Sequence, residues 1–522
     1  MASSPTRSLA AVVLAAGKGK RLRSGTPKVL HPVAGRPLIW HATRTALAAK
    51  PGRLVFVLGN GAERVEREVR SWGVSPAPVF VHQGDPLGTG HAMLAAEKAV
   101  GKAEDVLVVG GDFDPVTTED VRALLRLHRR TRSAATIVTA DVDEPGRYAR
   151  IVRDGTRLLE IVEGSDARGE LLERREVSAL VFAFRRDDLY GALPLVGREN
   201  RQAEYYLNGV FPILIDKGER VSVLKVDVGG RMGPNSRADL ARFGALVRSR
   251  INARHLENGV TIVDPETTYV DADVRIGAET TILPNTYLEG STVVGKDATI
   301  GPSARIVDSR IEDGAHVEFS VVEQARIGKR ASVGPFAHLR RDAVLKEESV
   351  VGNFVEVKDS TVGPGAKAKH LTYVGNARIG KRANLGAGTV TVNYDGYRKY
   401  ETVVEDEAKV GSDTMLVAPV RVGRGAQTGA GSVITKDVPA GALAVERSDQ
   451  RIVEGYRKRK DAEHRARRSD AGAVGAEANA RADADSDTRA AARSNGKGAR
   501  KAGTKGKAAG RAKGKGSHEG AS

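Results

Sequence analysis

The sequence predicts an α/β domain joined by a helical arm to a parallel β-helix of hexapeptide repeats, followed by a disordered basic tail. Three observations predict this organisation. Apolar runs alternate with helical patterns in the first half, an apolar–glycine pair recurs with a six-residue period in the second, and large apolar residues almost vanish near the end. The predicted segments are the α/β domain at 1–234, the linker helix at 235–257, the β-helix at 258–456 and the tail at 457–522.

The first segment has the alternating rhythm of an α/β domain. Its expected strands are Ala11–Ala15, Leu54–Leu58, Val79–His82, Val106–Val109 and Ala135–Val138. The first of them has an alternative interpretation, because Arg7 followed by the apolar run Leu9–Ala16 also fits a short signal peptide. The loop that follows this run favours a buried parallel strand.

An amphipathic helix is predicted over Ser236–Glu257, where it would join the two halves of the chain. One stripe of this helix is apolar and consists of Leu240, Phe243, Leu246, Val247 and Ile251.

A pair made of an apolar residue, once a threonine, and a glycine occurs at least thirteen times in the second half, mostly at intervals that are multiples of six. The pairs begin at Ile276, Val294, Ile300, Ile327, Val333, Val351, Val362, Val374, Ile379, Leu385, Val410, Val422 and Thr428. This period is typical of a parallel β-helix. We expect the first residue to point into the coil and the glycine to free the backbone at the corner. Irregular intervals, such as Val351 to Val362, indicate inserted or trimmed corners.

Composition excludes several kinds of site. The chain has 522 residues and no cysteine, so disulfides, zinc–thiolate sites and cysteine nucleophiles are absent. No apolar run approaches the length of a transmembrane helix.

The basic charge is concentrated at the end of the chain. The net charge is +17, and residues 456–522 hold 18 Lys and Arg against 8 Asp and Glu, which gives +10. This alanine- and glycine-rich tail cannot bury enough apolar surface to fold, so we expect it to be disordered. The alternative is weak, non-specific binding to a phosphate backbone, and nothing in the tail would read a base sequence.

A glycine-containing loop follows the first strand, at Leu14–Leu22. Gly17 and Gly19 allow backbone N–H groups to approach a phosphate, and Lys18, Arg21 and Lys28 supply positive charge. Neither a third glycine at the dinucleotide-binding spacing nor a P-loop string is present. The continuation Pro27-Lys28-Val29-Leu30 makes the pattern specific.

With this continuation, the loop resembles that of the sugar nucleotidyltransferases. With the hexad repeats, the chain up to about Tyr456 resembles the bifunctional N-acetylglucosamine-1-phosphate uridyltransferase/glucosamine-1-phosphate acetyltransferase family. The resemblance implies a Rossmann-like nucleotidyltransferase domain that uses UTP, a sugar 1-phosphate and Mg²⁺, and a left-handed β-helix that uses acetyl-CoA. It also implies a homotrimer whose acetyl-transfer sites lie between subunits.

The resemblance assigns residues in the first domain. Nucleotide binding is implied for Leu14, Ala15, Ala16, Gly17, Lys28, Gln83, Gly88 and Thr89, and magnesium binding for Asp112 and Asn235. Oxygen ligands suit Mg²⁺ in phosphoryl transfer. An alternative for Asp112 is a carboxylate that only ends a strand or a turn.

The sugar end of that site departs from the family pattern. The family has Tyr-Gly-Asp-x-Pro-Leu, Tyr-Gly-Arg, Asn-Thr-Gly and Leu-Thr-Asp, where this chain has Gly110–Pro115, Tyr148–Arg150, Ser178–Leu180 and Leu207–Gly209. Glu163 keeps the position of the family's sugar-binding glutamate, whereas a lysine two residues beyond is replaced by Ser165. Sugar-phosphate binding is therefore expected from Glu163, Ala149 and Ser178. Asp114 would add a carboxylate that repels substrate phosphate or recruits a cation.

Polar residues gather within the hexads around His370. An amine that attacks a thioester must lose a proton, and histidine titrates in the range suited to accept it. Nearby cations would hold a sugar phosphate. A structural histidine is the alternative, and for Asn393 and Tyr394 the alternative is a turn before an inserted loop.

By resemblance, His370 is the general base of acetyl transfer. Glucosamine 1-phosphate binding is implied for Arg340, Lys358, Tyr373, Asn384 and Lys399. Acetyl-CoA binding is implied for Ala387, Asn393, Tyr394, Ser412, Ala430 and Arg447.

Three functions remain open at this point. The first is a cytoplasmic bifunctional enzyme that makes UDP-N-acetylglucosamine for peptidoglycan, lipopolysaccharide and other cell-wall precursors. The second is an acetyltransferase whose first domain binds nucleotide but is inactive or uses another sugar 1-phosphate. The third is a non-enzymatic anionic-polymer binder that uses the tail.

Overall fold

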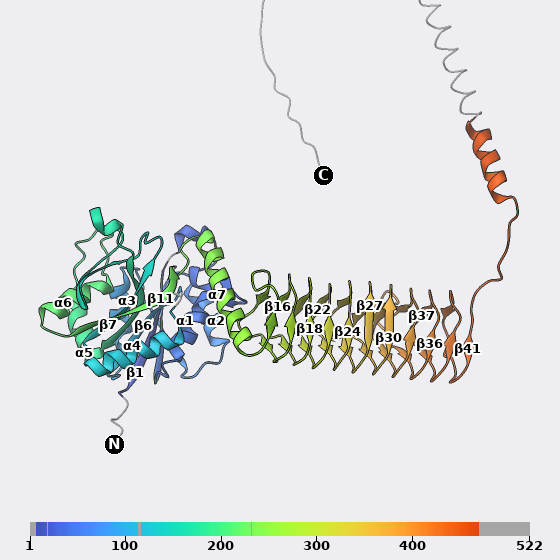
Figure 1. The fold of residues 1–522 in the computed structure, drawn as a ribbon, viewed down its shortest axis with the longest axis horizontal. Coiled ribbons are helices and arrows are strands. Elements are labelled where there is room, and N and C mark those ends of the chain that lie inside the picture. Colours follow the sequence, from blue (N-terminus) through green and yellow to red (C-terminus); the bar gives the residue numbers. More distant parts are fainter. Residues whose placement is uncertain (1–6, 18, 113–115, 231, 469–522) are drawn as a thin grey trace, which may run out of the picture. The chain divides into compact units, whose positions relative to one another are not determined.

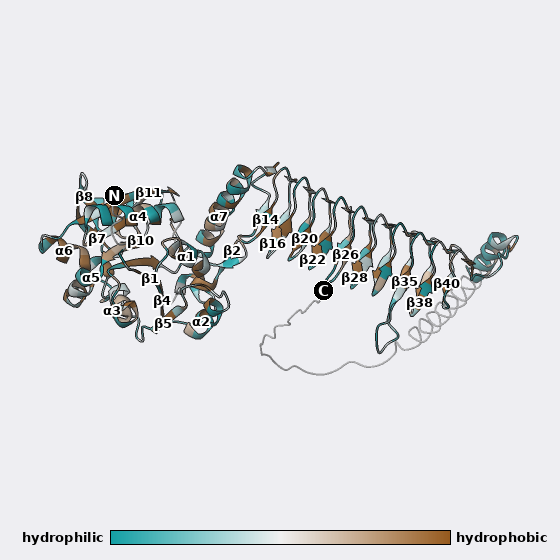
Figure 2. Cartoon of the chain, turned by 90° about the horizontal axis from the view of Figure 1, so that it is seen from below, coloured by the Kyte–Doolittle hydropathy of each residue, from teal (hydrophilic) through white to brown (hydrophobic). Residues whose placement is uncertain are grey.

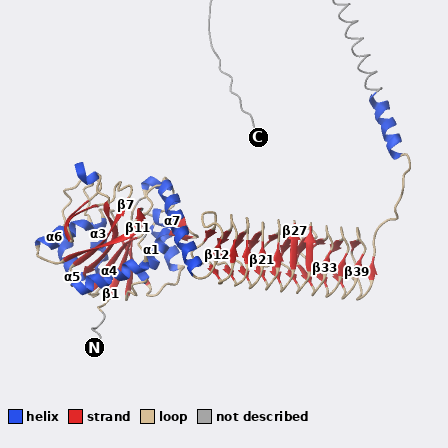
Figure 3. Cartoon of the chain, viewed as in Figure 1, coloured by secondary structure: helices blue, strands red, loops and turns tan. Residues whose placement is uncertain are grey.

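The computed structural model describes residues 7–17, 19–112, 116–230 and 232–468. The chain forms two compact units, Met1–Arg447 and Ser448–Ser522 (Figure 1). The first unit contains a mixed α/β region followed by a purely β region, which Figure 3 separates by colour. The tail predicted to be disordered from residue 457 instead begins within a helix at 456–468, and residues 469–522 lie outside the described residues.

A nine-stranded sheet forms the centre of the first domain. Its main path runs β11-β7-β10-β6-β1-β4-β5, and β8 and β9 extend it beside β10. The strands are β1 (Leu9–Ala15), β4 (Arg53–Leu58), β5 (Pro78–His82), β6 (Asp105–Gly110), β7 (Ala135–Val142), β8 (Arg150–Asp154), β9 (Arg157–Val162), β10 (Glu176–Arg185) and β11 (Val221–Gly230). All five strands expected from the sequence are present. Strand β1 pairs in parallel with β4 and β6, which favours the buried-strand interpretation over a signal peptide.

Helices cover both faces of this sheet. They are α1 (Leu38–Leu47), α2 (Ala62–Arg70), α3 (Thr89–Val100), α4 (Thr118–Thr131), α5 (Arg186–Ala192) and α6 (Val210–Asp216). Alternate residues of β1 enter two different cores, with Ala11 and Val13 on the side of α1 and α4, and Ala10 and Val12 on the side of α3. The central strands are therefore apolar on both faces, as their colour in Figure 2 indicates.

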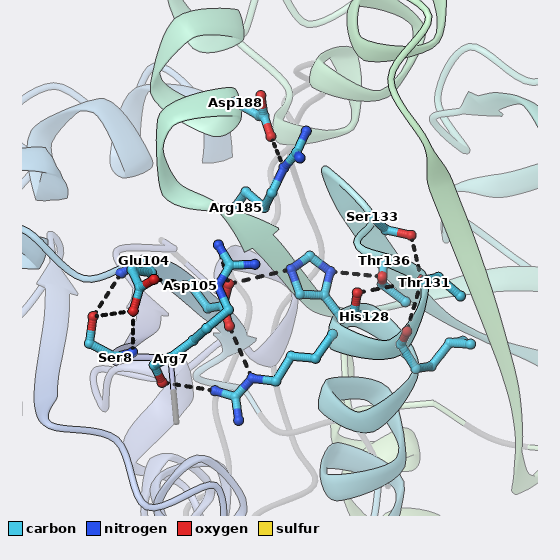
Figure 4. Close-up of polar contacts among 12 residues, drawn as sticks. Arg7, Ser8, Glu104, Asp105, His128, Thr131, Ser133, Thr136, Arg185 and Asp188 are labelled. Atoms are coloured by element: carbon cyan, nitrogen blue, oxygen red, sulfur yellow. Dashed lines mark hydrogen bonds and ion pairs between the residues drawn. The ribbon is translucent and has the colours of Figure 1, made fainter. Parts of the chain in front are cut away.

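A buried ionic network fixes the amino end of β6 (Figure 4). The Asp105 side chain is fully buried, and its Oδ2 accepts a hydrogen bond from Arg129 Nε at 3.0 Å. Arg7 and His128 lie 3.3 and 3.8 Å from Oδ1. Burial by itself raises the pKa of Asp105, but the nearby His128, the hydrogen bond from Arg129 and the charge of Arg7 lower it overall.

The predicted linker helix is present as α7 (Arg237–Glu257). It begins in a capping box, in which Ser236 Oγ accepts from Asp239 N and the Asp239 carboxylate accepts from Ser236 N. Of the predicted apolar stripe, Phe243, Val247 and Ile251 are buried, whereas Leu240 and Leu246 are half-buried. No helix within the described residues has the length and apolar character needed to cross a membrane.

The second half of the first unit is a left-handed β-helix with three parallel sheets, here called walls 1, 2 and 3. Wall 1 consists of β12 (Thr261–Ile262), β15 (Thr281–Ile282), β18 (Thr299–Ile300), β21 (His316–Val317), β24 (Ser332–Val333), β27 (Val350–Asn353), β30 (Lys367–His370), β33 (Asn384–Leu385), β36 (Lys409–Val410), β39 (Gln427–Thr428) and β41 (Leu443–Ala444).

Wall 2 consists of β13 (Tyr269–Val270), β16 (Tyr287–Glu289), β19 (Arg305–Val307), β22 (Val321–Glu323), β25 (His338–Leu339), β28 (Glu356–Lys358), β31 (Tyr373–Gly375), β34 (Val390–Val392), β37 (Met415–Val417) and β40 (Val433–Ile434). Wall 3 consists of β14 (Arg275–Ile276), β17 (Val293–Val294), β20 (Arg310–Ile311), β23 (Arg326–Ile327), β26 (Val344–Leu345), β29 (Thr361–Val362), β32 (Ala377–Ile379), β35 (Thr402–Val404) and β38 (Val420–Val422). A short hairpin in the first domain, β2 (Pro32–Val33) and β3 (Arg36–Pro37), completes the strands.

The hexad apolar residues fill the interior of the β-helix as predicted, since all of them except Ile276 are buried. The role predicted for the glycines was wrong in one respect. Among them, only Gly301 and Gly334 have positive φ. The left-handed residue instead lies two positions later at most corners, for example Asp297 (φ 55°), Arg330 (φ 53°) and Asp413 (φ 52°).

The repeat glycines are needed for close approach between coils. A methyl group on Gly328 would lie 2.7 Å from the carbonyl carbon of Lys346, and one on Gly363 would lie 2.7 Å from the carbonyl carbon of Gly380. Backbone atoms of the next coil therefore occupy the space that a side chain would need.

We expect Gly328→Ala to destabilise the β-helix by about 1–3 kcal/mol, because the added methyl group must displace backbone. Gly244→Ala in α7 is the matched control, since nothing lies within 4 Å of a methyl group there. That change should stabilise the helix by about 0.5–1 kcal/mol. Denaturant unfolding measures both, and equal effects would contradict the close-approach explanation.

Asp105→Asn should cost about 2 kcal/mol of unfolding free energy at pH 7, because it removes charged hydrogen bonds within the core. The pKa of Asp105 is lowered by folding, so its contribution is full above about pH 4 and is lost as pH falls through the folded-state value. The difference in unfolding free energy between wild type and variant, measured by urea titration, should become smaller below about pH 4. Asp187→Asn, at a carboxylate that is 91 % exposed, should show neither effect.

Candidate functional site

The first candidate site is a cavity of about 460 Å³ at the carboxyl ends of β1 and β6. All eight residues predicted to bind nucleotide line it, together with Asp112. Parallel strands of an α/β sheet present their carboxyl ends to ligands at this edge. The prediction therefore selected residues that the fold gathers in one place.

Tight backbone packing shapes this cavity. Gly19 adopts φ 56° and lies against the Lys28 side chain, so that a methyl group on it would lie 2.6 Å from Lys28 Cβ. Gly88 adopts φ 110° at the amino end of α3, and a methyl group added to Gly88 would lie 2.5 Å from the Tyr205 carbonyl oxygen. Gln83 is buried and donates from Nε2 to the Gly88 carbonyl at 2.9 Å.

The two predicted magnesium ligands meet at one cation. Lys28 Nζ lies 2.5 Å from Asp112 Oδ2 and 2.9 Å from Asn235 Oδ1, and Arg21 also donates to Asn235 Oδ1 at 2.9 Å. Two oxygen donors within reach of a single positive centre fit Mg²⁺, which takes few protein ligands and completes its shell with phosphate oxygens and water. Accordingly, the described residues contain no cluster of three or more His, Cys, Asp or Glu that would hold a metal alone. Asp114, predicted to add a carboxylate, lies outside the described residues.

The three residues predicted to bind the sugar phosphate in the first domain lie in two different places. Glu163 lines a second cavity of about 830 Å³ and accepts a hydrogen bond from Asn208 Nδ2 at 2.7 Å. Burial raises the pKa of Glu163, and the hydrogen bond from Asn208 opposes this shift. Ala149 and Ser178 are buried side by side, with Ser178 N donating to the Ala149 carbonyl at 2.9 Å, and neither lines the Glu163 cavity.

Sequence reasoning missed three contributors to these cavities. Asn208 appeared only as a departure from a motif, yet it is the partner of Glu163. Glu204 and Leu180 line the nucleotide cavity, and burial raises the pKa of Glu204. No local pattern marks these residues, because each reaches its cavity only through the tertiary fold.

The second candidate site runs along a corner of the β-helix. One residue from each of five successive coils occupies the same place, and these residues, called the His370 column, are Asn353, His370, Ala387, Ser412 and Ala430. The same hydrogen bond repeats along it: Leu371 N donates to Asn353 O, Gly388 N to His370 O, and Asp413 N to Ala387 O. His370 is exposed and directly precedes the predicted acetyl-CoA residues in the stack.

Cations flank this column. Lys358 and Lys399 place Nζ 3.9 and 3.8 Å from Asp359 Oδ2, and Arg340 pairs with Glu356 at 2.7 Å. Hydrogen bonding with Lys399 and its charge lower the pKa of Lys358, since two ammonium groups share a small space. Asp359 and Glu356, which hold these cations, were not predicted as site residues.

The remaining predicted residues lie around the column. Tyr373 is in β31 of wall 2, directly beside Glu356 of β28. Asn384 is in β33 of wall 1, on a different sheet from Tyr373. Arg447 donates to the Ala430 carbonyl at 3.2 Å.

The inserted loop after β34 delivers two of the predicted residues. Asn393 Nδ2 donates to Asn376 Oδ1 at 2.7 Å, while Tyr394 is exposed and forms an antiparallel bridge with Lys399. Asp395 Oδ1 accepts from Tyr397 N and Arg398 N, so the segment is also a turn. The segment is therefore a turn, as the alternative interpretation predicted, and its bridge pairs Tyr394 with Lys399.

Comparison with known proteins matches both halves of the chain. Residues 11–179 match the MobA-like NTP transferase domain, and residues 265–372 match the GMPPB C-terminal domain. The first match spans β1 to β10 and contains most of the nucleotide cavity.

Several relatives match about 450 residues of the chain. The bifunctional protein GlmU of Exiguobacterium sp. AT1b is 45 % identical over 453 residues, which are 86 % of this chain and 99 % of that protein. The proteins of the same name from Carboxydothermus hydrogenoformans and Geobacillus sp. WCH70 are each 43 % identical over 449 residues, covering 99 % and 97 % of their lengths. This chain therefore belongs to the family of the bifunctional protein GlmU.

Proposed function

We propose that this chain acetylates glucosamine 1-phosphate with acetyl-CoA and then transfers a uridylyl group from UTP to the N-acetylglucosamine 1-phosphate formed. The products are UDP-N-acetylglucosamine, a precursor of the cell wall, and pyrophosphate. The observation that carries the proposal is the coexistence of the two gathered sites, the nucleotide cavity and the His370 column, in one chain. Family membership supports the same pair of activities.

For acetyl transfer, the neutral amine attacks the thioester carbonyl, a C–N bond forms and the C–S bond breaks. His370 accepts the proton of the amine, because it is exposed and lies in the same column as Ala387 and Ser412, two of the residues that would hold acetyl-CoA. Arg340, Lys358 and Lys399 hold the sugar phosphate by charge-assisted hydrogen bonds.

For uridylyl transfer, an oxygen of the sugar phosphate attacks the α-phosphorus of UTP and pyrophosphate leaves. Lys28 is the cation of the cavity that neutralises charge on the phosphates, since its ammonium already lies between two oxygen atoms. Asp112 and Asn235 would hold Mg²⁺, which supplies further neutralisation at the phosphate oxygens. Glu163, held by Asn208, provides a hydrogen-bonding partner for the sugar.

We infer that the β-helix assembles as a homotrimer. An apolar ladder, consisting of Phe319, Phe336, Phe354 and Leu371, runs beside the His370 column and is 40, 54, 60 and 63 % exposed. Phe336 and Phe354 stack with ring centroids 5.4 Å apart. A continuous apolar edge of this kind favours burial against a second copy of the chain. Asn384 on wall 1 would then complete a site of another subunit.

The proposed co-substrates also indicate the cellular compartment of the enzyme. UTP and acetyl-CoA are cytoplasmic metabolites, so we place the enzyme in the cytoplasm, where a chain without cysteine also needs no disulfides.

Two variants should separate the activities. His370→Ala should lower acetyl transfer about 10²–10⁴-fold, the usual contribution of a general base, and leave uridylyl transfer unchanged. Asp112→Asn should lower uridylyl transfer and leave acetyl transfer unchanged. Pyrophosphate release and CoA release, measured on one preparation, report both, with His316→Ala as the control histidine on an earlier coil. Near-normal acetyl transfer by the His370 variant would show that His370 is not the general base.

Replacing Phe336 and Phe354 by serine should convert trimers to monomers, since buried aromatic anchors often contribute about 2 kcal/mol or more each. Analytical ultracentrifugation measures the mass, and acetyl transfer should fall with it while uridylyl transfer persists. Val263→Ser, at another exposed apolar side chain, should leave the trimer intact. A trimer that survives the double substitution would show that the ladder lies outside the interface.

A further inference from the structure

Leu180 has an unusual backbone conformation at the edge of the nucleotide cavity. It adopts φ 49°, in the left-handed region that a bulky side chain rarely enters. The register of β10 against β7 shifts between Ser178 and Phe182, so Leu180 lies in a β-bulge. Bulges re-aim side chains and often lie next to active sites. Strain of this kind persists where the surrounding structure holds it in place.

The bulge directs the Leu180 side chain over Gly110 at the end of β6. A methyl group on Gly110 would lie 2.8 Å from Leu180 Cδ2 and 3.1 Å from Asp112 Oδ1. Leu180 is therefore adjacent to the carboxylate that would bind the metal, which places it near the reacting phosphate. Gly111 also has no room for a side chain, because a methyl group there would lie 2.8 Å from the Leu14 carbonyl oxygen.

Gly110 and Leu180 therefore form one contact between β6 and β10. Leu180 Cδ2 occupies the space that a side chain at position 110 would need, so a larger residue at position 110 and leucine at position 180 do not fit together.

Leu180 presents an apolar side chain to the cavity beside the Asp112 carboxylate, and Leu14 also lines the cavity. An apolar side chain at this point suits a methyl group and cannot form a hydrogen bond with a hydroxyl.

We propose that Leu180 is a specificity-determining residue for the acceptor of uridylyl transfer, contacting the acyl methyl group of an N-acylated hexosamine 1-phosphate. Gly110 is the residue that makes room for it. This inference rests on the proposed uridylyl-transfer activity and names the feature of the acceptor that the cavity selects.

Kinetics with two acceptors test this selection. Leu180→Ala should lower the ratio of kcat/KM for N-acetylglucosamine 1-phosphate over glucose 1-phosphate by about tenfold or more, because the wall that distinguishes them is removed. Acetyl transfer on the same preparation should be unchanged. Leu172→Ala, at an exposed leucine outside the cavity, is the matched control and should keep the wild-type ratio.

A double-mutant cycle tests the interlock. Gly110→Ala should reduce uridylyl transfer and lower the Tm, because its methyl group collides with Leu180 Cδ2. Adding Leu180→Gly removes that obstacle, so the double variant should recover much of the loss in Tm, a clear departure from additivity. Losses that simply add would overturn the interlock.

The outcomes separate the two levels of the proposal. Wild-type protein that releases no pyrophosphate from UTP with either acceptor would refute the uridylyl-transfer function and the role of Leu180 with it. Wild-type activity with an acceptor ratio that Leu180→Ala leaves unchanged would overturn the inference alone.

Discussion

The close approach of successive coils at the glycine corners is the constraint on which the proposed acetyl-transfer site depends. Because backbone atoms of one coil fill the space above the glycine of the coil before, each coil has one permitted position relative to the next. Residues 17 to 25 positions apart are thereby fixed in columns. The His370 column arises in this way, since it stacks an asparagine, a histidine, two alanines and a serine that no local sequence relation connects.

The first domain uses the same physical device at a different place. Gly110 and Gly111 end β6 between β1 and the bulge of β10, and neither position has room for a methyl group. Asp112 follows directly, so its carboxylate is delivered to Lys28 by a backbone that cannot shift easily. Precise delivery of a few charged groups is what phosphoryl transfer requires of a protein.

Charge is arranged differently in the two sites. In the nucleotide cavity one ammonium group donates to two oxygen acceptors, a compact arrangement in a half-buried setting. Beside the His370 column, Lys358 and Lys399 share Asp359 on an exposed wall. Mutual repulsion lowers the pKa of Lys358, and a bound phosphate dianion would relieve it. The site beside the His370 column is therefore complementary to an anion even without a bound ligand.

The sequence by itself determined the features that depend on local periodicity. These are the burial of the hexad residues, the five predicted strands, the linker helix and the glycine loop with Lys28, because each is written in neighbouring residues. The nucleotide-binding residues and His370 were assigned from the resemblance of local motifs to a known family. Only the tertiary structure decided that the repeat glycines serve close contact rather than positive φ. It alone paired Leu180 with Gly110, Asn208 with Glu163 and Asp359 with Lys399. These pairs join residues about 40 to 70 positions apart, and such distances are set by how strands and coils stack, which no local pattern encodes.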